Sequence, residues 1–563
     1  MLDSAHKKLL GRIVLVAVVV VTLIVAPYTL TDPMGLPKLS MLSFFATVAL
    51  SLVLLKIKTL FRSQFRPLVI LLALFILQII LVFLFSGANL NSQFYGTYSR
   101  NTGALAYISL AVLLLSASLI SDREFLKRFI RVTLIIGLIL IIYGNMQYLG
   151  RDLFLYKNLY SFNSPVGTFG NSNFQSAFMG LIATVALAMV LNTAFKAPVR
   201  IGLAAIGFAA IMVVYETRSS QGYLNALAGL AIVAILWLFI HGRTTLATVG
   251  AGLTVVGGGL VLLALFNLGP LARFIFEASV AARLYYWRAA AKMLIDHPFF
   301  GVGMDGFGTW YLRYRETAMN KGFSTYSNSA HNVFADIATS GGVALVTIYC
   351  AIAVLVILSV VRVLRRKDGF DPYFLATVGA WFAWHVQSFV SINQLGLAIW
   401  GWVLSGLVIG YEINTQVKEI SREVPKRLKP SGKKSKTSAQ ELSSKAVLSL
   451  FMGVIAASLI ASPLFFANAR FHAAMNANDL KAVEAAGNQF PKDERRLYML
   501  AGILRNAQQD IKAIVVLQDA TKRYPDSFDL WTLWTTIPTA SPSEIASAKA
   551  QLKRLDPFNP DLK

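Results

Sequence analysis

Long apolar blocks determine what this chain can fold into. Each approaches the length of about 20 residues that a helix needs to cross a bilayer. Only 14% of the residues are charged, against roughly 25% in soluble domains. Because backbone groups inside a bilayer must pair within their own segment, the blocks are expected to be helices. We predict an all-α fold, a polytopic transmembrane bundle of about 13 helices with a C-terminal extracytoplasmic helical-repeat domain. The predicted spans are residues 13–30, 39–55, 67–85, 104–120, 132–149, 174–192, 201–215, 223–240, 245–266, 333–361, 373–390, 395–412 and 447–467.

The loops between these spans differ in charge from one side to the other. Lysine and arginine cluster in every second loop and after residue 412, whereas the alternate short loops hold few. Cytoplasmic loops carry the excess of positive charge in membrane proteins, so the basic set is assigned to the cytoplasm. This asymmetry accounts for much of the net charge of +24 without nucleic acid as a partner. The basic loops are residues 56–66, 123–131, 196–200 and 362–367.

The N-terminus and the single cysteine add two smaller predictions. Basic residues precede the apolar run of residues 13–25, as in a secretory signal, but no small-residue cleavage site follows. We expect a retained signal-anchor helix with its N-terminus in the cytoplasm. Cys350 lies inside an apolar block, where it is expected to pack as a small apolar residue.

The loop charges divide the chain into four parts. Residues 1–412 form a transmembrane domain, in which residues 268–332 make a large extracytoplasmic loop. Residues 413–446 are a basic linker, expected to lie along anionic lipid headgroups inside the cell. Residues 447–467 form the last membrane helix, and residues 468–563 an extracytoplasmic tail.

The tail contains a short repeat. Phe490-Pro491-Lys492-Asp493 recurs 34 residues later as Tyr524-Pro525-Asp526-Ser527, and more loosely as Leu555-Asp556-Pro557. A period of 34 is that of tetratricopeptide helix pairs. The tail therefore resembles a short tetratricopeptide array, a type of domain that binds a protein partner or supports a neighbouring domain.

Several basic side chains collect on the extracytoplasmic face of the predicted bundle. Arg100 precedes a span, Arg218 occupies a very short hairpin, Arg283 and Arg288 lie in the large loop, and His331 lies where the chain re-enters the membrane. Charges at membrane depth are costly and suggest function. Guanidinium groups bind phosphate oxygens through two parallel hydrogen bonds, and histidine takes up protons near neutral pH. The set therefore suits a phosphate-bearing substrate.

Each of these residues also has a structural alternative. Arg100 and Arg288 could extend to the membrane surface as interfacial residues. Arg218 could pair with Glu216. Arg283 lies one turn from Trp287 and could stack on its ring. His331 could cap a helix.

Two further features bear on the site. Asn171 and Asn173 open a span in the run Gly167-Thr-Phe-Gly-Asn-Ser-Asn-Phe174, where they could face the pocket or only cap the helix. No DxD or HExxH motif occurs, so we expect no metal and no cofactor.

The polar motifs, taken in order, resemble those of the O-antigen ligase and polymerase superfamily. They are the Gly167–Phe174 run, the Arg218 hairpin, Arg283 to Trp287, the Asp296-His-Pro-Phe-Phe-Gly-Val-Gly303 run and His331-Asn332. The resemblance covers roughly residues 90–410. One motif departs from the family pattern. The Arg218 hairpin reads Arg-Ser-Ser-Gln-Gly, where many relatives have Arg-Ser-x-Gly.

The resemblance implies a metal-independent, inverting transfer of a glycan from an undecaprenyl diphosphate carrier to an acceptor hydroxyl, on the outer face of the bacterial cytoplasmic (inner) membrane. His331 would be the base, and Arg218 and Arg283 would bind the diphosphate. These three form the predicted catalytic set. The predicted substrate-binding set is Arg100, Arg288, Asn171, Asn173, Tyr286, Trp287 and Asn332.

Alternatives to this function remain at the level of sequence. The acceptor could be a glycan, a lipid or a protein, and the last would make the chain a protein O-oligosaccharyltransferase. A flippase for lipid-linked glycans would favour charges throughout the bundle and an internal repeat of its helices. A scaffold that recruits proteins through the tail would not need His331. Membrane lipids are expected as partners in every case.

Overall fold

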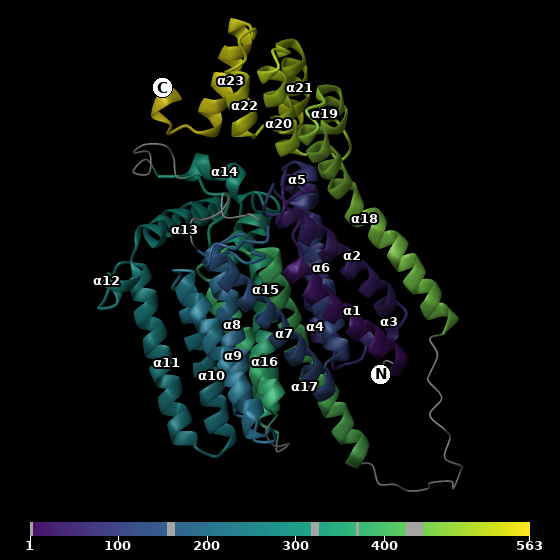
Figure 1. Ribbon diagram of the computed structural model, residues 1–563, viewed down its shortest axis with the longest axis vertical. Helices are drawn as coiled ribbons and strands as arrows, with labels where there is room; N and C mark the ends of the chain where they lie inside the picture. Colours follow the sequence, from purple (N-terminus) through teal and green to yellow (C-terminus); the bar gives the residue numbers. More distant parts are fainter. Residues whose placement is uncertain (1–3, 155–163, 317–325, 367–370, 424–442, 563) are drawn as a thin grey trace.

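The fold is built from helices alone in the part of the chain that the structure describes. The computed structural model describes residues 4–154, 164–316, 326–366, 371–423 and 443–562 (Figure 1). Within these residues no strand occurs, and the helices form a long bundle with a smaller helical tail at one end. The predicted all-α fold is confirmed.

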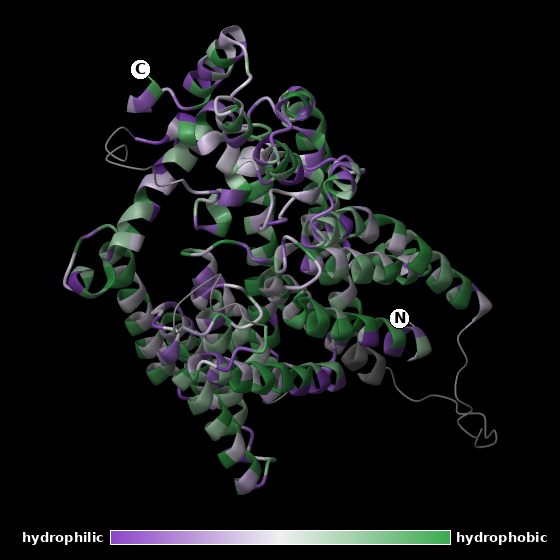
Figure 2. Ribbon diagram, turned by 45° about the horizontal axis from the view of Figure 1, so that its top comes forward, coloured by the Kyte–Doolittle hydropathy of each residue, from purple (hydrophilic) through white to green (hydrophobic). Residues whose placement is uncertain are grey.

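Each of the thirteen predicted spans falls on a helix. Among the described residues, nine helices are long and apolar enough to cross a membrane. Figure 2 shows apolar residues running along the bundle and hydrophilic residues at its ends and in the tail. The chain is therefore a multi-pass membrane protein. The thirteen helices are α1 (Ser4–Leu23), α2 (Gly35–Leu54), α4 (Arg66–Phe85), α6 (Ala104–Ile120), α7 (Arg123–Tyr148), α8 (Ser172–Val190), α9 (Ala197–Glu216), α10 (Gln221–Ile240), α11 (Thr244–Leu265), α15 (Val333–Leu364), α16 (Pro372–Ser388), α17 (Leu395–Glu423) and α18 (Ser444–Asn476).

Small residues allow the central helices to pack closely. Helix α17 lies against α6, and a Cβ atom added at Gly410 would stand 2.1 Å from the carbonyl oxygen of Ser118. At Gly406 it would stand 2.2 Å from that of Leu114. Packing of backbones through small residues is the usual way in which membrane helices associate.

Helix α15 is broken, whereas the sequence predicts one continuous span. The break lies at Gly341 and Gly342, and Gly342 has a φ of +74°. The segment after α13 enters the break. The Val343 amide donates to the Pro298 carbonyl at 2.8 Å, and the Val302 amide donates to that of Thr339 at 2.7 Å. Hydropathy does not register this break, because the residues on both sides of it are apolar.

Lys38 falls in the loop between the predicted spans 13–30 and 39–55, but in the structure it belongs to a helix. It lies inside α2, fully buried, and its ammonium donates to the carbonyls of Val21, Thr22 and Ile24 at 3.0 Å each. These carbonyls lie at the C-terminus of α1, where backbone acceptors lack helical partners. Lys38 therefore caps a helix inside the bundle.

Shorter helices cover the end of the bundle at which the tail sits (Figure 1). Helix α13 lies within the predicted loop of residues 268–332, and α14 packs against both α13 and the tail. These helices are α5 (Leu90–Tyr95), α12 (Ala272–Ile275), α13 (Ala278–Asp296) and α14 (Phe307–Tyr314), whereas the short α3 (Ile57–Leu60) lies at the other end.

The tail consists of paired helices that follow the last membrane helix without a break. Helix α18 continues nine residues beyond the predicted end of its span and packs against α19. The repeated Phe490-Pro491 and Tyr524-Pro525 dipeptides occupy equivalent turns, before α20 and before α22. The tail helices are α19 (Leu480–Gly487), α20 (Glu494–Asn506), α21 (Asp510–Arg523), α22 (Phe528–Trp534), α23 (Pro542–Leu555) and the 3-10 helix η3 (Pro560–Leu562).

The predicted basic linker can be compared with the structure only at its two ends. Residues 413–423 complete α17, and residues 444–446 begin α18. Residues 424–442 lie outside the described part of the chain.

Candidate active site at the start of helix α15

His331 lies in a tight turn that introduces α15. Its φ is +52°, and its amide donates to Ser329 Oγ at 2.9 Å. The next residue, Asn332, caps the helix by accepting from the amides of Phe334 and Ala335. The His331 ring stacks on Tyr286 of α13 at a centroid distance of 5.6 Å. The cap is thus Asn332, and the imidazole of His331 is directed toward α13 instead.

Asp336 holds the His331 turn from one helical turn away. Its carboxylate accepts from the Ala330 amide at 2.8 Å and from Ser329 Oγ at 2.6 Å. Asp336 is 4% exposed. A buried carboxylate that receives several hydrogen bonds fixes the backbone around it, so the left-handed conformation of His331 is imposed by its surroundings.

The surroundings of His331 keep its imidazole neutral. Burial lowers its pKa to about 4, and the positive charges of Arg283 and Arg100 act in the same direction. A histidine with this pKa is unprotonated at neutral pH. An unprotonated imidazole can accept a hydrogen bond from a hydroxyl, although a pKa of about 4 makes it a weaker base than an ordinary histidine.

Arg283 acts on His331 through its charge, and one of its nitrogen atoms has no hydrogen-bond partner among the described residues. It precedes Tyr286 by three residues on α13, so both side chains point from one face of that helix. Its Nε atom is buried and has no hydrogen-bond partner among the described residues. Burial also lowers the pKa of this guanidinium. The alternative contact with Trp287 is not formed among the described residues, where Trp287 packs on Phe266 instead. An unpartnered guanidinium is a ready receptor for an anion.

Arg100 is committed to two carboxylates. Its Nε atom donates to Asp305 at 3.1 Å, and Nη2 lies 3.5 Å from Asp336. All three side chains are buried, with Arg100 7% exposed. Arg100 thus joins the loop before α6 to the loop of residues 301–306, which contains Asp305, and to the start of α15. It influences His331 through its charge, and its Nη1 atom is buried without a partner in the described part of the chain.

Asp305 is a central residue of this region that the sequence did not reveal. Its carboxylate accepts from the Thr97 amide at 2.7 Å and from Thr102 Oγ1 at 2.8 Å, besides the Arg100 contact. In the sequence, its only signal was a lone aspartate in the run Gly303-Met304-Asp305-Gly306. In the structure, Asp305 has a φ of +58°. Asp336 was missed for a similar reason, because it reads as the first acidic residue of an ordinary helix.

Arg218 lies at the tip of the α9–α10 hairpin. It is exposed and has a φ of +54°. Its neighbours are tied down, since Ser164 Oγ donates to the Thr217 carbonyl and Ser176 Oγ to that of Ser219. Among the described residues Arg218 forms no ion pair with Glu216, and it is not one of the charges that act on His331.

The remaining predicted residues occupy the edges of the region. Arg288 is exposed, pairs with Glu316 at 3.3 Å and lies over the Tyr285 ring, as an interfacial residue would. Asn171 caps α8 by accepting from the Asn173 amide at 2.8 Å. His331, Arg283, Tyr286 and Asn332 are therefore the predicted residues that the structure brings together.

No group of three or more histidine, cysteine, aspartate or glutamate side chains suited to a metal ion occurs within the described residues. The acidic groups nearest to His331, Asp305 and Asp336, share Arg100 as their common partner.

Residues 204–350, from α9 into α15, match the O-antigen ligase family. This segment of the chain is similar to the O-antigen ligase family. The matched segment contains Arg218, Arg283, Asp305, His331 and Asp336, whereas Arg100 and the tail lie outside it. No curated protein matches the chain. The match supports glycan ligation or polymerisation in general, and the matched segment carries the histidine and the arginine that the geometry singles out.

Proposed function

We propose that this O-antigen ligase homologue transfers a glycan from an undecaprenyl diphosphate carrier to an acceptor hydroxyl on the outer face of the cytoplasmic membrane, with inversion at the anomeric carbon. The observation that carries the proposal is the neutral His331 imidazole beside the unpartnered Arg283 guanidinium. The first is a base and the second an anion receptor, and both lie within the family match.

In the proposed reaction, His331 removes the proton from the acceptor hydroxyl. The hydroxyl oxygen attacks the anomeric carbon and forms the new glycosidic bond. The bond from that carbon to the diphosphate breaks, and the lipid diphosphate leaves with the electron pair. Arg283 binds the diphosphate, and Arg218 binds it from the α9–α10 hairpin. Each charge-assisted hydrogen bond contributes about 1.5–3 kcal/mol to offsetting the negative charge.

The other site residues support these two groups. Arg100, Asp305 and Asp336 position the His331 turn, and Tyr286 supports its ring. Because arginines take the place of a metal, we expect glycan transfer to continue in EDTA. Loss of transfer in EDTA and its recovery with Mg²⁺ or Mn²⁺ would contradict this mechanism.

Purified His331→Ala and His331→Gln variants test the base assignment. Loss of a general base lowers the chemical step by about 10²–10⁴-fold, while binding of the lipid-linked donor is expected to stay near normal. Arg283→Ala is expected to weaken donor binding as well, and Arg283→Lys to restore it only in part, because lysine keeps the charge but not the planar fork. A well-folded His331→Ala variant that transfers glycan at the wild-type rate would refute the proposal.

A further inference from the structure

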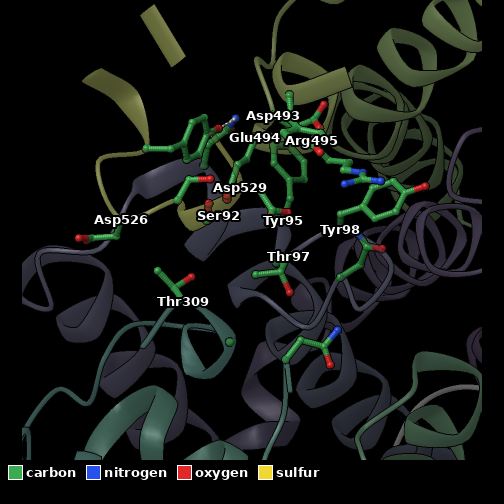
Figure 3. Close-up of a pocket in the computed structure, with 18 of the residues that line it drawn as sticks. Ser92, Tyr95, Thr97, Tyr98, Thr309, Asp493, Glu494, Arg495, Asp526 and Asp529 are labelled. Carbon is green, nitrogen blue, oxygen red and sulfur yellow. Dashed lines mark hydrogen bonds between the residues drawn. The ribbon is translucent and has the colours of Figure 1, made fainter. Parts of the chain in front are cut away.

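A cavity of about 530 Å³ lies between the tail and the extracytoplasmic loops (Figure 3). Loop residues 91–101 and the start of α14 form one side of it, and the first turns of α20 and α22 form the other. The residues assigned to catalysis do not line it. Figure 3 shows side chains of both parts, among them Thr97 and Thr309 from the loops and Glu494 and Asp529 from the tail, around one space.

The lining of this cavity is polar and holds five acidic side chains and one arginine, Arg495, which lies over the rings of Tyr98 and Tyr498. Asp526 is paired with Arg313 and Arg554, and Asp493 with Arg496. Burial raises the pKa of Glu494 to about 7, and Asp529 and Asp493 act in the same direction. Glu494 is therefore only partly ionised at neutral pH.

One acceptor in the lining has no protein partner within the described residues. Asn101 lines the cavity and is 4% exposed. Its Oδ1 atom has no hydrogen-bond partner among the described residues. Leaving such a group unpaired costs about 1–3 kcal/mol, so a ligand hydroxyl in its reach would be favoured.

The charges and aromatic rings of the lining indicate which class of ligand the cavity can bind. The acidic side chains of the lining outnumber its one arginine, Arg495, so the cavity suits a diphosphate less well than an uncharged ligand. A strongly cationic peptide would need more free negative charge than Asp529 and a half-protonated Glu494 provide. Sugar hydroxyls donate to carboxylate and amide oxygens, and the apolar faces of sugar rings pack on aromatic rings such as those of Tyr95 and Tyr326, both of which line the cavity.

The position of the cavity relates it to the candidate active site. Thr97 and Asn101 flank Arg100, and Asn328 precedes His331 by three residues. The same loops therefore form one wall of the cavity and hold the catalytic turn. A sugar chain held in the cavity would therefore contact the same loops that position His331.

We propose that this cavity binds an uncharged stretch of oligosaccharide and so holds the sugar chain between the tail and the membrane domain. This inference rests on the proposed function, and it adds a glycan-binding site formed jointly by the tail and the loops. The sugar chain belongs either to the lipid-linked donor or to the acceptor.

The test uses the full-length protein in detergent and the oligosaccharide that mild acid releases from the lipid-linked glycans of the source cells. Saturation-transfer NMR and a titration measure its binding. Asp529→Asn and Tyr326→Ala alter exposed lining residues and are expected to weaken binding at least tenfold. Asp561→Asn and Tyr28→Ala change exposed residues of the same types outside the cavity and are expected to bind normally.

Three further measurements separate the outcomes. His331→Ala is expected to bind the released oligosaccharide normally while it loses transfer, so failure of the base assignment is distinguishable from failure of the cavity assignment. Competition by the intact lipid-linked donor, or by purified acceptor glycan, identifies which sugar chain occupies the cavity. Absence of oligosaccharide binding, equal binding by the lining and control variants, or displacement of the probe only by a lysine-rich peptide would overturn the proposal.

Discussion

His331 combines a left-handed backbone conformation with a ring held against Tyr286, and both depend on groups from other segments. Asp336 fixes the turn, and Arg283 supplies a positive charge beside the imidazole. The pKa of His331 is therefore a property of the assembled site, and it can be changed without altering the histidine itself.

We expect Arg283→Gln to raise the pKa of His331 from about 4 toward its ordinary value of 6.5, because it removes one of the two charges that lower it. The histidine signals in NMR titrations measure this, with His331→Gln providing the assignment. Arg288→Gln removes a charge of the same helix that does not act on His331, and should leave the pKa unchanged. Equal titration of His331 in the Arg283→Gln variant and the wild type would contradict the arrangement.

The same pKa fixes how stability depends on pH. Between about 4 and 6.5 the unfolded chain binds a proton at His331 and the native chain does not, so the native state loses stability as the pH falls through this range. His331→Gln is expected to lose this contribution. If the stabilities of the wild type and His331→Gln instead diverge above pH 6.5, the pKa of His331 is raised in the native state and the assignment is refuted.

How far single residues could be predicted depended on whether their signal was local. Arg283 and His331 stood out because charge and imidazole are unusual next to membrane spans. Asp305 and Asp336 were missed because their importance arises from Arg100, which lies 205 residues before the first and 236 before the second. Arg100 itself was predicted to bind substrate, whereas the structure supplies it with two protein carboxylates, and its direct role remains a prediction.

At the level of elements, the break in α15 ties the helix that follows the His331 turn to residues distant in sequence. The chain after α13 enters this break, and Gln78 of α4 donates to the carbonyls of Phe299 and Gly341 at 2.8 and 3.0 Å. Three segments thus meet at one point. The spans themselves were predictable because hydropathy is a local property, but a break stabilised by residues 298–302 depends on a partner distant in sequence.

Gly342→Ala is expected to destabilise the protein by about 1–3 kcal/mol, since only glycine readily adopts its φ of +74° and ψ of −174°. The added Cβ would also lie 2.4 Å from the Pro298 carbonyl oxygen. Thermal unfolding in detergent measures the change. Gly258→Ala is the matched control, because a Cβ there meets nothing within 4 Å and the residue is helical. Equal unfolding temperatures for the two variants would refute this account of the break.

On the scale of the whole molecule, the tail is fastened to the loops that carry the site. Arg315, at the end of α14, forms a buried ion pair with Asp556 at 2.5 Å, and Arg313 pairs with Asp526. Asn468 of α18 donates to Thr31 at 2.7 Å. The sequence suggested a helical-repeat tail but not its docking, because the paired charges lie more than 200 residues apart.

We expect Arg315→Ala or Asp556→Ala to loosen the tail, because breaking a buried pair leaves one charge uncompensated at a cost of about 3–5 kcal/mol. Limited proteolysis of the tail measures this as faster cleavage. Replacing both partners with apolar residues, as in Arg315→Met with Asp556→Leu, should restore much of the protection. Lys512→Ala breaks an exposed pair with Glu484 and serves as control, with little effect expected. Equal cleavage of all variants would show that this pair does not hold the tail.

The last prediction concerns which side of the membrane the site faces. The tail, α13 and α14 lie at one end of the bundle, and the α10–α11 hairpin lies at the other (Figure 1). Because the basic loops indicate a cytoplasmic assignment for the hairpin end, the tail and the His331 turn are expected outside the cytoplasm. This assignment is testable with single cysteines in a Cys350→Ala background, which removes the one native thiol.

In intact cells, after permeabilisation of any outer membrane, a membrane-impermeable maleimide is expected to label Ser543→Cys in the tail. It should leave Thr244→Cys, at the α10–α11 hairpin, unlabelled until the cytoplasmic membrane is disrupted. Both positions are exposed in the structure, so a difference in labelling reports sidedness and not burial. Labelling of Thr244→Cys alone would invert the topology. It would place His331 on the cytoplasmic side and contradict glycan transfer on the outer face, since the tail is docked onto the same loops that hold the catalytic turn.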